Sequence, residues 1–478
     1  MKNRYPIFNI ILATFFICVS TICCSPDEMN SGIPKIGNIP DSAFEQALID
    51  LGYDDVLDGK IVTANVANVL ELNIPDYDFN NSDNDIKDLT GIEYFISLTK
   101  LNCSGQNLTL LNLNNNLNLR ELDCGYSKYQ SLSRLNISKN TALEILKCHE
   151  NNLTSLDVSN NIYLKELYTY GLQLNSLNVS NNIALKILWC YGNPISNLDV
   201  TQNTNLEVLD CRFMNLTSLD VSNNTKLKHL SFWDNQISNI DVSNNLALEY
   251  LACMDNKLTN MDVSNNIALE GFGCGGNQLT SINISNNTAL KSFACENNQI
   301  TTLDLGNNVA LDNLSFGNNP ISSIDISKNT YLTYVTCNNT LITNLDLSEN
   351  TALEVLHCNK NQQLMSLDLS NNPSLIWLVC NDNNLNSLNL SGITNITTFE
   401  CYNNLLTSLN LNSLSNLTYL NCANNLLGSL DVSNNSSLSV LDCTSNGLSC
   451  IQVNNVQLNN IPPDWIKDDT ANYATTCN

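Results

Sequence analysis

The sequence predicts a repeat solenoid, mainly β, with a parallel concave sheet of about 17 short strands between a helical N-terminal cap and a disulfide-closed C-terminal cap. Cysteine recurs at steps that are mostly 21 or 42 residues, and a 21-residue pattern repeats seventeen times. Self-similarity at a period of about 20 to 50 residues marks a solenoid, in which each unit buries its apolar face against the next. Because such a fold grows by stacking, most of the 478 residues can form one continuous domain.

The recurring cysteines are expected to form a ladder of packed side chains inside the solenoid. They occupy positions 103, 124, 148, 190, 211, 253, 274, 295, 337, 358, 380, 401, 422 and 443. Where a step of 42 skips a unit, the position holds Thr169, Phe232 or Phe316, which a redox or metal role would not tolerate. In-register strands also hold neighbouring Cβ atoms about 4.8 Å apart, beyond the usual disulfide range of about 3.5–4.5 Å. We therefore expect inert, unpaired thiols in this ladder.

One unit, starting at Leu143, is LEILKCHENNLTSLDVSNNIY, or L-x-x-L-x-C-x-x-N-x-L-T-S-L-D-V-S-N-N-x-x. The seventeen units begin near Leu98, Leu119, Leu143, Leu164, Leu185, Leu206, Leu227, Leu248, Leu269, Leu290, Leu311, Leu332, Leu353, Leu375, Ile396, Leu417 and Leu438. The core L-x-x-L-x-[LC]-x-x-N-x-L is the leucine-rich repeat pattern, and the short return LTSLDVSNN resembles the internalin-like repeats of bacterial surface proteins. The resemblance covers about residues 91–448 and implies a leucine-rich repeat array there.

The open ends of a solenoid expose its core, so both ends need caps. At the front, residues 39–90 are predicted to form a helical cap, because Asp41 is a candidate helix N-cap and the apolar Phe44 and Leu48 lie on one side of the helix. The segment DDVLDGK that follows resembles a calcium loop only faintly and is expected to be a turn.

At the back, residues 449–478 are predicted to form the C-terminal cap. Cys450 and Cys477 lie there outside the 21-residue register. Two off-register cysteines in an exported segment predict one disulfide that closes this cap.

The N-terminus predicts export. Residues 1–23 have a basic start, then an apolar run too short for a permanent membrane span, as in a secretory signal. The signal ends in paired cysteines and resembles a bacterial lipoprotein signal, which implies that Cys24, or alternatively Cys23, is the lipidated first residue and that residues 24–38 form a tether. The acidic SPDE that follows resembles the export signal of Bacteroidetes lipoproteins. The resemblance implies a lipid anchor in the cell outer membrane, with the protein facing outward.

Charge and motifs disfavour several functions. The formal net charge of −25 repels phosphate backbones, so a nucleic-acid partner is not expected. The sequence has no G-x-S-x-G, H-E-x-x-H or phosphate-loop motif, and the serines and aspartates at the repeat-consensus positions lie in the returns, away from the histidines on the strands. We therefore expect no enzyme and no cofactor.

The returns carry a column of aspartates at one position of the unit: Asp157, Asp199, Asp220, Asp241, Asp262, Asp304, Asp325, Asp346, Asp368 and Asp431. A calcium-binding edge is one interpretation, but calcium-binding repeats usually supply several oxygens and glycines per turn, and this return has few glycines. We favour a solvated face in which each carboxylate bonds to the following Ser hydroxyl or backbone, and we assign no metal site. Two further columns, of asparagine, are expected to hydrogen-bond unpaired backbone groups.

Strand alternation places a block of aromatic residues on the concave face. Because Leu188 and Cys190 face inward, Trp189 and Tyr191 face outward. From the fourth to the eighth unit the outward positions hold the candidate ligand-binding residues Tyr168, Tyr170, Trp189, Tyr191, Asp210, Arg212, His229, Trp233 and Tyr250, followed by Met254. Beyond them Gly271, Gly273 and Gly275 mark an edge.

A contiguous aromatic block on an exposed sheet marks an interaction site, although aromatic residues also cover sheets for structural reasons. The sequence therefore predicts a non-catalytic surface protein, expected to be monomeric, that binds a protein or glycan ligand on its concave face. The alternatives are a passive surface-coat or spacer protein and, less favoured, a hydrolase. A second candidate surface on the same face would be formed by Trp377, His357 and Tyr402.

Overall fold

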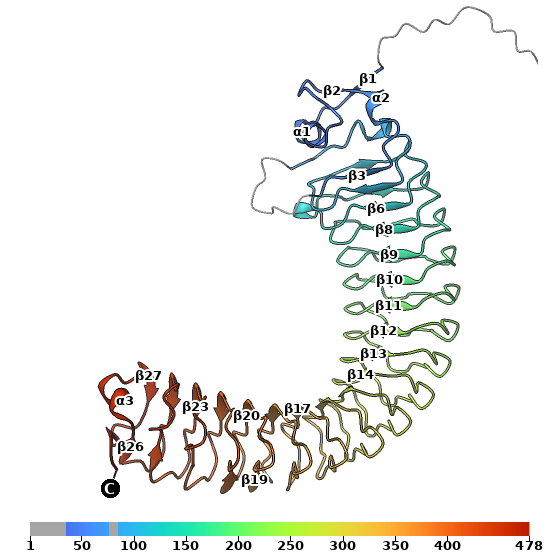
Figure 1. Cartoon of the computed structure of the whole chain (residues 1–478). Coiled ribbons are helices and arrows are strands. Elements are labelled where there is room, and N and C mark those ends of the chain that lie inside the picture. Colours follow the sequence, from blue (N-terminus) through green and yellow to red (C-terminus); the bar gives the residue numbers. More distant parts are fainter. Residues whose placement is uncertain (1–34, 76–84, 478) are drawn as a thin grey trace, which may run out of the picture.

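The computed structural model describes residues 35–75 and 85–477 and confirms a parallel β-solenoid. Figure 1 shows an open arc, with the main sheet along its inner side in the C-terminal arm and strands such as β19 on the outer side. Nineteen strands of the described residues form this concave sheet. They are β3 (Glu71–Asn73), β4 (Lys100–Asn102), β6 (Glu121–Asp123), β8 (Ile145–Lys147), β9 (Glu166–Tyr168), β10 (Ile187–Trp189), β11 (Val208–Asp210), β12 (His229–Ser231), β13 (Tyr250–Ala252), β14 (Gly271–Gly273), β15 (Ser292–Ala294), β16 (Asn313–Ser315), β17 (Tyr334–Thr336), β18 (Val355–His357), β20 (Trp377–Val379), β22 (Thr398–Glu400), β23 (Tyr419–Asn421), β25 (Val440–Asp442) and β27 (Asp464–Ile466).

Seventeen of these strands come from the seventeen predicted units, and each cap adds one more, β3 at the front and β27 at the back. Among the described residues β3 pairs only with β4 and β27 only with β25, so the sheet is an open arc and not a closed barrel (Figure 1). The caps therefore cover the core by extending the sheet as well as by packing against it.

Each unit meets the next in exact one-unit register. Leu188 pairs with Leu167 on one side and with Leu209 on the other, and all three are buried. The strands show one buried residue between two more exposed ones, and the ladder residue that follows is buried again. This alternation confirms the predicted register, with Trp189 and Tyr191 on the outer surface of the sheet and Cys190 inside.

Short strands also pair along the returns. They are β5 (Leu111–Asn112), β7 (Leu135–Asn136), β19 (Ser366–Asp368), β21 (Ser387–Asn389), β24 (Leu430–Asp431), β26 (Cys450–Gln452) and β28 (Asn472–Ala474). Two asparagine columns hold the other parts of each unit, one directly after the strands and one in the returns. Behind the strands, the Asn193 amide donates to the carbonyls of Thr169 and Cys190 at 2.8 and 2.9 Å and accepts the Leu174 N–H at 3.0 Å.

The second asparagine column lies in the returns. The Asn245 amide donates to the carbonyls of Val221 and Asn224, each at 2.9 Å, and Asn245 is fully buried. Equivalent bonds recur in the neighbouring units, for instance at Asn224 and Asn266. The asparagines therefore supply the buried carbonyls of the corners with donors, which agrees with the structural role predicted for them.

Left-handed backbone follows every strand of the seventeen units, a feature that was not predicted from the sequence. The eighth residue of each unit has a positive φ: Gly105, Tyr126, Glu150, Gly171, Gly192, Phe213, Asp234, Asp255, Gly276, Asn297, Asn318, Asn339, Lys360, Asp382, Asn403, Asn424 and Ser445. Gly, Asn and Asp adopt this conformation with little strain, and they fill most of these positions. The chain thus turns sharply out of the sheet at one fixed point of the unit.

The N-terminal cap is mixed rather than purely helical. Helix α1 (Ser42–Asp50) begins at the predicted N-cap, since the Asp41 side chain accepts the N–H groups of Ala43 and Phe44. The cap also contains β2 (Lys60–Val62), the short helix α2 (Thr63–Val66) and strand β3, with the 3₁₀ turns η1 (Ile92–Tyr94) and η2 (Lys128–Gln130) further along. Strand β1 (Ile36–Asn38), at the end of the predicted tether, pairs antiparallel with β2. These short elements lack a periodic signal in the sequence.

The DDVLDGK segment is a turn organised by a buried side chain. Glu45 in α1 is 2% exposed, and its Oε1 accepts the N–H groups of Asp58, Gly59 and Lys60 at 3.0, 2.6 and 3.0 Å. Three backbone N–H groups thus converge on one oxygen of this carboxylate and hold the segment against α1. The predicted turn is therefore confirmed.

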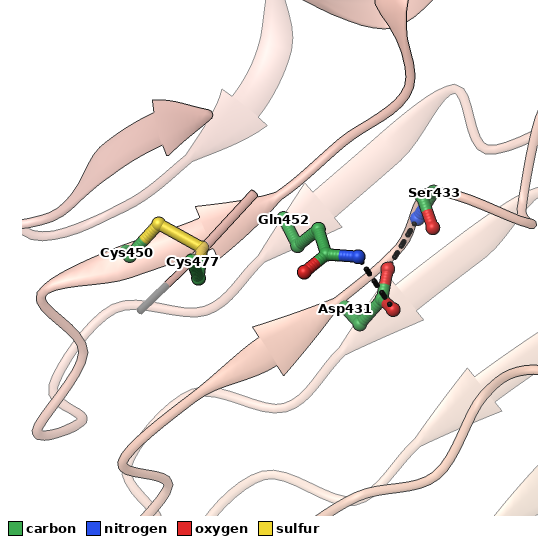
Figure 2. Close-up of a disulfide and its surroundings, with 5 residues drawn as sticks. All are labelled: Asp431, Ser433, Cys450, Gln452 and Cys477. Carbon is green, nitrogen blue, oxygen red and sulfur yellow. Dashed lines mark hydrogen bonds between the residues drawn. A yellow bond between two sulfur atoms is a disulfide. The ribbon is translucent and has the colours of Figure 1, made fainter. Parts of the chain in front are cut away.

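The C-terminal cap is closed by the predicted disulfide. Cys450 in β26 is bonded to Cys477, with Cα atoms 5.8 Å apart (Figure 2). The cap also holds α3 (Asn455–Asn459), which Asn454 caps, and Trp465 in β27, whose indole N–H donates to the Leu438 carbonyl at 3.3 Å. Beside the disulfide, Gln452 donates to Asp431 (Figure 2), which ties the cap to the last return.

The signal, the lipidation candidates Cys23 and Cys24 and most of the tether lie outside the described residues. Within the described residues, no helix has the length and apolar character needed to span a membrane.

Candidate ligand-binding surface

The thiol ladder is a packed interior and not a reactive site. All fourteen ladder cysteines of the described residues are unpaired and buried. Burial raises the pKa of the Cys148 thiol to about 12 and that of the Cys253 thiol to about 12 as well. A thiol that stays protonated at neutral pH is a poor nucleophile and a poor metal ligand. Thr169, Phe232 and Phe316 replace cysteine in the same buried column, as expected for simple packing.

The seventh residue of successive units forms a continuous stack on the concave sheet. The rings of His149 and Tyr170 lie 4.3 Å apart with planes at 21°, and those of Tyr170 and Tyr191 lie 4.5 Å apart with planes at 6°. The Arg212 guanidinium then lies 4.4 Å from the Tyr191 ring and 5.5 Å from the Trp233 ring. The spacing matches the strand spacing of about 4.8 Å, so the sheet itself sets the stack.

Arg212 is fixed from two sides. Its Nε lies 3.1 Å from the Asp210 carboxylate, and its guanidinium lies between the two rings. Burial raises the pKa of Asp210, although Arg212 opposes this shift. Asp210 is therefore a partner that holds Arg212 in the stack, and its carboxylate is already engaged.

A second row of rings lies beside the stack at the fifth position of the unit. The rings of Tyr168 and Trp189 meet edge to face at 5.2 Å, and Trp189 also lies 6.2 Å from the Tyr170 ring. The Tyr168 hydroxyl donates to Glu166 at 2.9 Å, and Lys147 lies 5.6 Å from the Tyr168 ring. These contacts leave the rings half-buried and give them defined orientations.

The Tyr170 and Tyr191 hydroxyls stay protonated at neutral pH. Burial raises the pKa of Tyr170 to about 12, with further contributions from Tyr191, Glu150 and Asp123. Burial also raises the pKa of Tyr191. The surface therefore offers phenol groups that both donate and accept hydrogen bonds.

Glycines bound the surface at both ends. At the N-terminal end the His149 ring lies over Gly125, with its Cε1 2.5 Å from the point where a Cβ would stand. At the C-terminal end Tyr250 leans over Gly271, and Met254 leans over Gly273. Tyr250 also stacks on His229, with ring centroids 4.8 Å apart and planes at 11°. The predicted edge at these glycines is thus a platform on which the last side chains rest.

The structure brings the predicted residues into two groups. Tyr168, Tyr170, Trp189, Tyr191, Asp210, Arg212 and Trp233 share one network, while His229 and Tyr250 form a neighbouring pair at the third position of the unit. The site prediction missed His149, Lys147 and Phe213, whose ring meets Trp233 at 4.2 Å. Hereafter "the aromatic surface" means the nine predicted residues together with His149.

His149 could have been assigned from its outward position in the third unit. Phe213 could not, because it reaches Trp233 from the left-handed eighth position, where φ is 51°.

The second candidate surface is smaller. His357 lies edge to face with Tyr334 and Trp377, at 5.9 and 4.9 Å, and burial lowers its pKa. Trp377 is 43% exposed. No ring contact in the described part of the chain joins Tyr402 to this group. The surface therefore holds Trp377 and His357 with Tyr334, a residue that the site prediction omitted.

The aspartate column is engaged with its own backbone. Asp199 accepts the N–H and the hydroxyl of Thr201 at 2.9 and 2.7 Å, and Asp325 does the same with Ser327 at 3.0 and 2.7 Å. Hydrogen bonds to Ser159 lower the pKa of Asp157 in the same way. Among the described residues no group of three or more His, Cys, Asp or Glu side chains could hold a metal ion.

Fold and unit together define a leucine-rich repeat solenoid. A scan against protein-family models finds no match, and no curated protein matches the chain. Among solved structures, the chain is similar to the functional domain of InlJ from Listeria monocytogenes, a domain that includes a cysteine ladder. The two share 29% identity over 83% of this chain and 82% of that one, with a TM-score of 0.64.

Two other solved structures share the fold. The leucine-rich repeat protein LIC12759 of Leptospira interrogans is 21% identical over 85% of this chain and 97% of its own, with a TM-score of 0.60. The plant peptide hormone receptor RGFR1, in complex with RGF2, is 17% identical over 79% of each chain, with a TM-score of 0.56. The repeat array is therefore internalin-like in architecture.

Proposed function

We propose that the chain is a non-catalytic recognition protein that binds a protein or glycan ligand on the aromatic surface. The observation that carries this proposal is the ordered set of large side chains on the concave sheet. These side chains do not fill the core, which the leucines and the ladder residues already fill. Rigid aromatic and Arg side chains are the residues that most often anchor an interface.

The fold supports a binding role in a general way. RGFR1, with the same fold, is seen in complex with RGF2. The thiols here are buried and protonated, and the return carboxylates bond to their own backbone. These groups are thereby engaged in the fold and not presented as catalytic groups to a substrate.

We also propose that the protein acts outside the cell, held by a lipid on Cys24 in the outer membrane and facing outward. The support is the signal-like sequence of residues 1–23, the paired cysteines that end it and the acidic residues that follow. The Cys450–Cys477 disulfide is consistent with an oxidising compartment.

The test is a ligand screen with a surface variant. The full chain in mild detergent is applied to a glycan array and to arrayed extracellular proteins, beside Trp189→Ala/Tyr191→Ala. Binding that the variant loses supports recognition on the aromatic surface. Binding that the variant keeps contradicts this surface, and the absence of any binding favours a passive coat protein.

A further inference from the structure

We propose that the ligand of the aromatic surface is a basic polypeptide segment rather than a glycan. This inference rests on the proposed function and names the ligand class for the same surface. Two independent observations lead to it, one from the orientation of the rings and one from the charges along the two borders of the surface.

The central rings have no free faces. Tyr170 lies between His149 and Tyr191, and Tyr191 lies between Tyr170 and the Arg212 guanidinium. Sugars bind aromatic side chains by laying C–H groups on an open ring face. Here the ring edges and the phenol hydroxyls are what the stack presents to a ligand. Edges and hydroxyls suit the amide groups and small side chains of a polypeptide better than the flat face of a pyranose.

One border of the aromatic surface is electrically balanced. From the third to the eighth unit the second residue is charged, with three acids and three bases: Glu144, Lys165, Lys186, Glu207, Lys228 and Glu249. Glu144 lies 2.8 Å from Arg120 and 2.6 Å from Lys165, and Glu207 lies 3.1 Å from Lys186 and 3.8 Å from Lys228. Each acid here has basic neighbours, so this border favours neither sign of ligand charge.

The opposite border carries three acidic side chains and no base. Glu150 lies at one end of it and Asp234 and Asp255 at the other, all in the left-handed eighth position of their units, with Gly171, Gly192 and Phe213 between them. None of the three has an ion pair within the described residues. The Glu150 carboxylate lies over Gly171, with its Oε1 2.8 Å from the point where a Cβ would stand, and its charge contributes to raising the pKa of Tyr170 and Tyr191.

The basic side chains of the surface do not offset this border. Lys147 lies 3.9 Å from Asp123, and Arg212 lies 3.1 Å from Asp210, so each is already matched by a carboxylate. The aromatic surface and its borders therefore carry an excess of negative charge, on a chain whose formal net charge is −25. Electrostatic complementarity therefore favours a polypeptide ligand that carries lysine or arginine side chains along one of its edges. From Glu150 to Asp255 is five strand steps, about 24 Å, a length that an extended segment of about seven residues covers.

The experiment selects peptides from a random 12-residue phage library on the full chain and measures their affinities as synthetic peptides. We expect the selected peptides to be net positive. Trp189→Ala/Tyr191→Ala should weaken them by about tenfold or more. The border variant Glu150→Gln/Asp234→Asn/Asp255→Asn should weaken them by about fivefold, with a smaller effect of salt on the remaining affinity.

The matched control is Asp220→Asn/Asp241→Asn/Asp262→Asn, which removes the same three charges from the returns. Asn already fills this return position at Asn178 and Asn283, where it accepts the same Ser N–H, so the control should fold normally. We expect its peptide affinity to change less than twofold.

Neutral or acidic selected peptides would overturn the inference. Equal losses of peptide affinity in the border variant and in its control would also overturn it. Glycan-array binding that Trp189→Ala/Tyr191→Ala abolishes would also overturn it, while leaving the proposed function in place. Selected peptides that bind Trp189→Ala/Tyr191→Ala as tightly as the unchanged chain would contradict both the inference and the proposed binding on the aromatic surface.

Discussion

Tyr170 and Tyr191 stack almost parallel, with ring centroids 4.5 Å apart and planes at 6°. Each tyrosine lies two residues after its strand. The strands β9 and β10 are paired in register, and the backbone pairing continues past them, since the Gly171 N–H donates to the Tyr191 carbonyl at 3.0 Å. The parallel sheet therefore dictates the ring spacing, and the rings are ordered before any ligand arrives. Such pre-organisation lowers the entropic cost of binding.

The first prediction concerns stability. Leu188→Ala should lower the free energy of unfolding by about 2–5 kcal/mol, because it opens a cavity in the core. Trp189→Ala/Tyr191→Ala should lower it by only about 1–3 kcal/mol for both changes together, since the two rings are half-buried and lose a few stacking contacts. Urea unfolding of the two variants measures the difference. A loss clearly above about 3 kcal/mol in the double variant would show that these rings belong to the core.

The second prediction concerns the ladder thiols. In the native protein they should not react with a thiol reagent at pH 8, because burial raises their pKa values and blocks access. Mass spectrometry under non-reducing conditions should find the Cys450–Cys477 bridge and no bridge among Cys253, Cys274 and Cys295. Cys274→Ala should cost about 1–2 kcal/mol. Rapid labelling of the folded protein would contradict the packing account.

The third prediction concerns pH. Burial lowers the pKa of His149 from its ordinary 6.5, so the unfolded chain binds this proton first as pH falls. Stability should therefore decline as pH drops below about 6.5 and level off once pH is below the folded pKa. His149→Gln should show a smaller decline between pH 7.5 and 5 in urea unfolding. Hydrogen bonds from Ser159 and Thr201 lower the pKa values of Asp157 and Asp199, so the stability that these two carboxylates contribute is lost only at more acidic pH. If the free energy of unfolding of His149→Gln fell with pH as steeply as that of the unchanged chain, the lowered pKa of His149 would not be the cause of the decline.

The fourth prediction concerns the anchor. Cys24→Ala should stop palmitate labelling and release the protein from the membrane fraction, because the lipid is the proposed means of retention. Cys23→Ala is the matched control and should remain anchored. If Cys23→Ala loses the label and Cys24→Ala keeps it, the neighbouring cysteine is the lipidated one.

Much of this architecture follows from the 21-residue period. The period indicates where each strand lies, and the alternation L-x-C puts Leu188 inside and Trp189 outside. The off-register positions of Cys450 and Cys477 were enough to predict their bond. These features depend on local pattern repeated many times, and so the sequence reveals them.

Other features depend on how particular side chains settle between units. Arg212 lies in the stack because Asp210 and the rings of Tyr191 and Trp233 hold it there. The repeat pattern of the sequence does not predict these contacts. Phe213 reaches Trp233 from a left-handed position that most units give to Gly, Asn or Asp. Strands β3 and β27 come from caps that lack the repeat, so their places in the sheet are set by the exposed core they cover.

The most direct test of recognition on the aromatic surface is the dissociation constant of one screened ligand for three proteins: the unchanged chain, Trp189→Ala/Tyr191→Ala and Tyr163→Ala/Tyr331→Ala. Tyr163 and Tyr331 are 59% and 69% exposed and lie outside the concave strands, so their removal controls for the loss of two exposed rings. The account predicts that the concave variant binds about thirtyfold more weakly, from a loss of about 2 kcal/mol, while the control binds like the unchanged chain. Equal affinities for all three proteins would contradict it.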